Sequence, residues 1–187
     1  MSLWEKPWNS SIAGARGRSV LLAVDTNVLL DQALQNADVL DALEIIRERL
    51  HEARFIVTST VLEELARIAF HGATAEGRKA AEIALRSLIS WGYEPLNIIP
   101  VGKGIAEQIS FKLRSRGIIP DEEQNDAAII AEAALIGCSI LLSSDGHLIE
   151  AAKHPRFYAL LEECSVEGDK LLIARPREIV RRFYRKR

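Results

Sequence analysis

Short runs rich in Leu, Ile and Val alternate along the chain with longer segments in which apolar residues recur every three or four positions. The runs predict strands at residues 20–25, 55–58, 97–101, 138–143 and 170–174. The longer segments predict helices at residues 37–51, 60–71, 75–91, 104–116, 122–136, 146–152 and 177–185. Continuous apolar strands that alternate with helices are typical of a parallel sheet covered on both faces. The pattern therefore predicts an α/β fold in three layers, α/β/α, with a central parallel sheet of four to five strands.

The length of 187 residues fits one domain with a full core, and we expect it at residues 19–187, after an N-terminal extension at residues 1–18. No apolar stretch approaches the roughly 18 residues that span a membrane, so we expect no membrane contact. The start lacks a secretory pattern, and two cysteines make a poor disulfide framework. These features predict a cytoplasmic protein.

The formal net charge of −2 argues against a protein that binds nucleic acid by bulk positive charge alone. It does not argue against a nuclease, whose acidic centre is offset by metal ions. No Cys and His residues have the spacing of zinc ligands, so zinc is not expected. The four histidines include His147, two residues after Asp145, which we interpret as a surface residue, with a position facing the cleft as the alternative.

Four acidic residues stand where an acidic residue is least expected: Asp25, Glu64, Asp126 and Asp145. Two of them end apolar strands, and parallel strands place their carboxyl ends at one edge of the sheet, where sites lie in open α/β folds. The other two lie on the apolar faces of helices or at their edges. Carboxylates near a core are costly unless they are paired or bind a metal, so their convergence would form an oxygen site for Mg²⁺ or Mn²⁺.

Each acid also has a simpler interpretation when taken alone. Asp25 fits a helix cap, Glu64 a solvated surface residue, and Asp145 a turn residue before glycine. Asp126 is the least ordinary of the four, because it shares a face with apolar residues, while Asp121 and Gln124 resemble a capping box that would leave it free. Three neighbours suit a role in orienting the acids through hydroxyl and amide groups: Thr26, Asn27 and Ser143.

The motifs around these acids resemble those of the PIN-domain nuclease family over about residues 19–183. The matching segments are Asp25-Thr26-Asn27, Val61–Leu65, Asn125–Ala131, Ser143–Asp145 and Ile173–Glu178. The resemblance implies an endoribonuclease that uses Mg²⁺ or Mn²⁺ at the four acids to cut single-stranded RNA, leaving a 5′-phosphate and a 3′-hydroxyl. Residues 72–95 and the N-terminal extension are long for a minimal toxin-type member.

The remaining expectations concern contacts with substrate and partners. Basic side chains at Lys112, Arg114 and Arg116 are candidates for RNA phosphate contacts, although a solvated face is the alternative. A non-catalytic nucleic-acid-binding module with the same fold, an antitoxin or other protein partner, and a homodimer through the Ala-rich helix at residues 80–88 all stay open. A phosphoacceptor receiver domain is disfavoured, because no acidic pair precedes Asp25.

Overall fold

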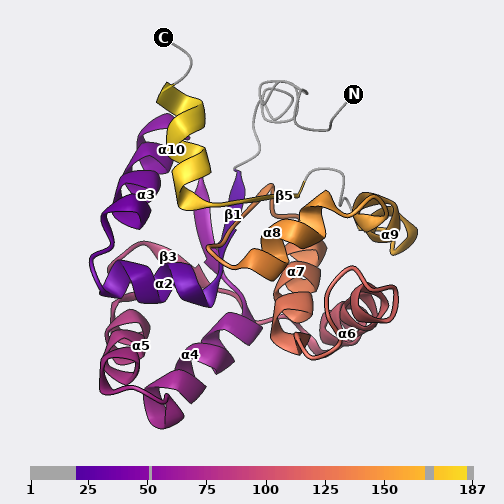
Figure 1. The fold of residues 1–187 in the computed structure, drawn as a ribbon, viewed down its shortest axis with the longest axis horizontal. Helices are drawn as coiled ribbons and strands as arrows, with labels where there is room; N and C mark the ends of the chain where they lie inside the picture. The colour runs from indigo at the N-terminus through magenta and orange to yellow at the C-terminus, as the bar shows by residue number, and fades with distance from the viewer. Residues whose placement is uncertain (1–19, 51, 167–170, 185–187) are drawn as a thin grey trace.

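The protein is described by a computed structural model that covers residues 20–50, 52–166 and 171–184. Its centre is a five-stranded, all-parallel sheet in the order β3-β2-β1-β4-β5. The strands are β1 (Leu21–Val24), β2 (Arg54–Val57), β3 (Tyr93–Pro95), β4 (Ile140–Leu142) and β5 (Leu172–Ala174). Helices flank the sheet, as Figure 1 shows, so the predicted three-layer α/β/α architecture is confirmed.

The helices follow the strands in the alternation that the sequence predicts, with two that it did not predict, α2 and α9. Their bounds are α2 (Thr26–Ala33), α3 (Ala37–Arg49), α4 (Ser59–His71), α5 (Ala75–Ser87), α6 (Pro100–Ser115), α7 (Gln124–Ile136), α8 (Gly146–Lys153), α9 (Phe157–Glu163) and α10 (Pro176–Tyr184). Among the described helices, none has the length and apolar character needed to cross a membrane. The predicted N-terminal extension, residues 1–18, lies outside the described part of the chain.

The register of the central strands brings the carboxyl ends of β1 and β4 together. Leu22 pairs with Phe55 of β2 on one side and with Ile140 of β4 on the other. At the end of β1, the Asp25 N–H donates to the Leu142 carbonyl oxygen at 3.0 Å. The residues that follow these two strands therefore emerge side by side at one edge of the sheet.

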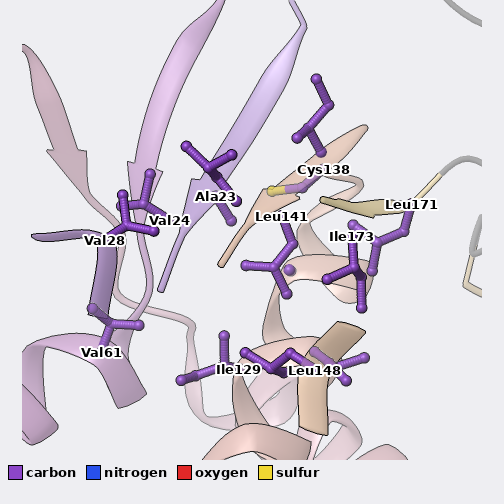
Figure 2. Close-up of a cluster of buried hydrophobic side chains, with 14 of the residues drawn as sticks. Ala23, Val24, Val28, Val61, Ile129, Cys138, Leu141, Leu148, Leu171 and Ile173 are labelled. Atoms are coloured by element: carbon purple, nitrogen blue, oxygen red, sulfur yellow. The ribbon is translucent and has the colours of Figure 1, made fainter. Parts of the chain in front are cut away.

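The core lies between β1 and β4 and the helices that cover them. Ala23, Val24 and Leu141 have no exposed surface, and Ile129 of α7 and Leu148 of α8 are equally buried. Figure 2 shows these side chains in one apolar cluster that reaches from the strands to the helices. Burial of such side chains contributes about 1.5–3 kcal/mol each, which fixes the helices on the strand ends.

The strand predicted at residues 97–101 is wrong. The third strand is β3, and the apolar run after it leads into α6, whose first residue is Pro100. Proline suits the first turn of a helix because that N–H has no partner within the helix. β3 lies at the edge of the sheet, where Pro95 is tolerated, and of its three residues only Tyr93 is buried.

The predicted capping of α7 by Asp121 is also wrong. Glu123 is the residue before the helix, and Asp121 is exposed and ion-paired with Arg114 at 2.8 Å. The apolar side chains of the predicted homodimer face are not exposed, because Ala80, Ala84 and Leu88 are buried within the chain. Helix α5 packs against α2 and α4, so these side chains belong to the core of the chain, and a homodimer stays a prediction.

A buried hydrogen bond joins α2 to the sheet and gives a test of the core. The Tyr93 hydroxyl donates to Gln32 Oε1 at 2.7 Å, and both residues are at most 5 % exposed. Tyr93→Phe should destabilise the protein by about 1–3 kcal/mol, because it leaves a buried amide oxygen without its donor. Urea unfolding measures the loss. The double variant Gln32→Met with Tyr93→Phe should recover much of it, and equal losses in both variants would contradict this account.

Candidate metal centre

Asp25 is a buried carboxylate held at both of its oxygens. The Thr26 N–H donates to Oδ1 at 2.6 Å, so Asp25 caps α2, and the Ser143 hydroxyl donates to Oδ2 at 2.8 Å. The Asn27 amide lies 3.5 Å from Oδ2. The capping interpretation of Asp25 is therefore confirmed, and it is compatible with a site because a carboxylate offers about four lone-pair positions.

Glu64 reaches the start of α2 from the second turn of α4. The Thr26 hydroxyl donates to Glu64 Oε2 at 2.6 Å, and the Arg67 guanidinium lies 3.6 Å from Oε1. Glu64 is half-buried while Glu63 is exposed, as the helical projection predicts. The contact with Thr26 places the Glu64 carboxylate beside Asp25.

Asp126 lies in the first turn of α7 and has an oxygen with no hydrogen-bond partner. Its side chain is 15 % exposed, and Oδ2 is buried without a donor. The His147 imidazole lies close to it, with Nδ1 3.7 Å from that oxygen. A buried carboxylate oxygen without a donor is unfavourable unless a cation or water completes it.

Asp145 follows β4 and caps α8. The His147 N–H donates to Asp145 Oδ1 at 2.6 Å, and the Asp145 N–H donates to the Ser143 hydroxyl oxygen at 2.9 Å. The Ser143 hydroxyl thus accepts from the backbone of one acid and donates to the side chain of another. This single group links the ends of β1 and β4.

The four predicted acids converge at the carboxyl edge of the sheet. Burial raises the pKa of Asp25 to about 6, and repulsion from Glu64 and Asp145 adds to the shift. Burial likewise raises the pKa of Asp126 to about 7, with repulsion from Asp145, Asp25 and Glu123. Thr26 joins Asp25 to Glu64, and Ser143 joins Asp25 to Asp145. The His147 Nδ1 lies 3.7 Å from Asp126 and 4.0 Å from Asp145, so residues over a hundred positions apart form one acidic cluster.

Two further residues lie at this acidic cluster: Glu123, which sequence reasoning missed, and His147, for which a position facing the cleft was the less favoured alternative. Each offers one ligand atom, and with Asp126 these atoms lie within 4.8 Å of one another. His147 was interpreted as a surface residue, and it is half-exposed, yet its Nδ1 is 3.4 Å from Glu123 Oε1. Their signals were positional: Glu123 lies three residues before Asp126, about one helical turn, and His147 two residues after Asp145.

The predicted phosphate-contacting residues on α6 are engaged in ion pairs. Lys112 and Arg116 both contact Glu163, with nitrogen–oxygen distances of 3.3 and 2.7 Å. Arg114 contacts Asp121. The structure does not bring these side chains into contact with the four acids, and their role toward a nucleic acid stays a prediction.

Comparisons with known proteins agree with this fold. The fold is similar to VapBC2 from Rickettsia felis bound to a DNA fragment from their promoter, with a TM-score of 0.55 and 13 % identity over 83 % of this chain and 98 % of that chain. It is also similar to VapBC-1 from nontypeable Haemophilus influenzae, with a TM-score of 0.51 and 17 % identity over 72 % and 93 % of the two chains. No curated protein matches the sequence. The family model described as PIN domain matches residues 22–154, and the chain therefore belongs to the PIN domain family.

Proposed function

We propose that this protein is a metal-dependent endoribonuclease that hydrolyses phosphodiester bonds in single-stranded RNA. The observation that carries the proposal is the convergence of four carboxylates in one partly buried cluster: Asp25, Glu64, Asp126 and Asp145. A non-catalytic nucleic-acid-binding module would not need all four acids, and a close group of like charges is destabilising by itself. Retention of the complete set favours an enzyme.

The residues present fit Mg²⁺ or Mn²⁺. The donors are mainly carboxylate oxygens, which these hard cations prefer. The buried Asp126 Oδ2 has no donor, so a cation would supply the partner that the protein does not. A bound ion of this kind lowers the pKa of a coordinated water and offsets charge on a phosphate.

The chain's own groups hold the acids in place for this role. The Thr26 hydroxyl orients Glu64, and the Ser143 hydroxyl orients Asp25, with Asn27 nearby. We propose that these three residues position the ligands, because groups behind metal ligands commonly change affinity or activity by about 10–100-fold. Glu123 and His147 extend the set of donors on the α7 and α8 side.

Substrate and partner contacts complete the proposed function. We propose that Lys112, Arg114 and Arg116 contact RNA phosphates by exchanging their present carboxylate partners for phosphate oxygens. Two of the similar structures are of VapBC2 and VapBC-1, and with them in view we propose that an antitoxin or other protein partner regulates this chain. We propose that the enzyme acts in the cytoplasm. A homodimer would need a surface other than the buried side chains of α5.

Replacing one of the four acids should strongly reduce cleavage, whereas replacing a neighbouring exposed acid should not. Glu64→Gln and Asp25→Asn should each reduce Mg²⁺- or Mn²⁺-dependent cleavage of a labelled single-stranded RNA by at least about 100-fold, since loss of a ligand should exceed the effect of groups behind it. Glu63→Gln is the matched control, because Glu63 is exposed on the same helix. Equal activity in Glu64→Gln and Glu63→Gln would refute the assignment.

Metal should stabilise the folded protein. An ion that binds only the folded state, at a free concentration of about 100 times its Kd, adds about 2.7 kcal/mol to the free energy of unfolding. Millimolar Mg²⁺ or Mn²⁺ should therefore raise Tm. The double variant Asp25→Asn with Asp126→Asn should show no such rise in a thermal denaturation series. A rise of the same size in that variant would mean that the ions bind elsewhere.

The metal-free protein should lose stability as pH rises from about 4 to about 7. The pKa values of Asp25 and Asp126 are raised to about 6 and about 7 from 3.8, so the folded state binds more protons than the unfolded state in that window. Their stabilising contribution is complete below pH 4 and is lost as pH passes the folded values. Urea unfolding with chelator, compared between wild type and Asp126→Asn, isolates the effect. A difference that does not change with pH would contradict it.

A further inference from the structure

Helix α7 carries a second buried carboxylate that the proposed chemistry does not use. Glu132 is 5 % exposed, and with Asp25 it is one of two buried acids in the part of the chain that the structure describes. Burial of an unpaired carboxylate is strongly unfavourable, so its partners explain its position.

The partners of Glu132 lie at the start of another helix. The Ser59 hydroxyl donates to Glu132 Oε1 at 2.8 Å, and the Thr60 N–H donates to Oε2 at 3.1 Å. These residues form the first turn of α4, whose own capping position, Thr58, makes no side-chain capping bond. Glu132 therefore supplies the cap of α4 from α7, and its charge also meets the positive end of the α4 dipole.

The two helices joined in this way each carry one acid of the candidate metal centre. Glu64 lies four residues after Thr60, and Asp126 lies six residues before Glu132. At 1.5 Å per residue these separations correspond to about 6 and about 9 Å along the helix axes. Glu132 thus joins α4 to α7 through these hydrogen bonds, and both of its carboxylate oxygens are occupied by Ser59 and Thr60.

We infer that Glu132 is a positioning residue that fixes α4 against α7 so that Glu64 and Asp126 face the same ion. The inference rests on the proposed function for the identity of the ion, and it concerns metal binding before cleavage. Loss of the tie lets α4 shift relative to α7, which weakens the ion's affinity without removing any ligand.

The test compares two cap losses in the full-length protein. Glu132→Ala removes the cap of α4, and Thr74→Ala removes the cap of α5, where the Gly77 N–H donates to the Thr74 hydroxyl at 3.0 Å. Helix α5 carries none of the four acids, so Thr74→Ala is a matched control for lost helix stability. The measurements are the Kd for Mn²⁺, obtained by fitting the rise of Tm with Mn²⁺ concentration, and the Mn²⁺ concentration that gives half-maximal cleavage.

Both variants should lower Tm in chelator. Of these two variants, Glu132→Ala alone should raise the Kd for Mn²⁺ and the Mn²⁺ concentration for half-maximal cleavage, by about 10–100-fold, in the range for residues that orient metal ligands. Glu132→Gln, which keeps an accepting oxygen for the Thr60 N–H, and Ser59→Ala, which removes one of two bonds, should give intermediate shifts. These two milder variants serve if Glu132→Ala does not fold.

The outcomes separate the inference from the function on which it rests. Equal Mn²⁺ dependence in wild type, Glu132→Gln and Ser59→Ala overturns the positioning role and leaves the nuclease proposal intact. A wild-type protein that binds Mn²⁺ but cuts no RNA overturns the nuclease proposal, while the shifts in Mn²⁺ affinity still test Glu132. A shift as large in Thr74→Ala as in Glu132→Ala shows general destabilisation and refutes the inference.

Discussion

The parallel pairing of β1 with β4 is the constraint on which the site depends. Because Val24 is in register with Leu142, β1 and β4 end at the same level of the sheet, and the residues that follow them, Asp25 and Ser143, are hydrogen-bonded. Both strands are buried on either side, so a slip of register would expose apolar side chains and separate the acids. The core therefore fixes the spacing of the acids before any polar contact refines it.

Helix N-termini offset the cost of gathering so much negative charge. Asp25 caps α2, Asp145 caps α8, and Asp126 lies in the first turn of α7. Each placement near a helix start is worth about 0.3–1 kcal/mol or more where the group is partly buried. The helix starts thus lower the cost of folding with an acidic cluster. The Asp126 Oδ2 nevertheless has no hydrogen-bond donor. Local capping and a shared site are thus two uses of the same side chains.

Much of this organisation was predictable because it depends on local patterns. The apolar runs that end in Asp25 and Asp145 indicated both the strands and their acidic ends, and the helical projection separated Glu64 from Glu63. Apolar runs alone did not distinguish a strand from the exposed start of a helix. Ile99 and Val101 are 71 % and 72 % exposed, which no pattern of residues 97–101 indicates.

Contacts between segments that are distant in the chain could not be predicted from local sequence patterns. Helix α2 is only eight residues long, and its start depends on the cap that Asp25 provides. His147 joins the pocket only because α8 packs beside α7, and Glu132 has a partner only because α7 packs against α4. Each depends on tertiary packing, which a periodic pattern of one chain segment does not encode.

The double attachment of Asp25 has a consequence for ion size. With Oδ1 held by the Thr26 N–H and Oδ2 by the Ser143 hydroxyl, this carboxylate is not free to rotate into a two-oxygen grip. Calcium commonly takes six to eight oxygens in flexible shells, whereas magnesium demands a small, near-octahedral one. In the proposed metal site, an aspartate held at both oxygens would suit the smaller cation, so the rigidity of one side chain would favour magnesium over calcium.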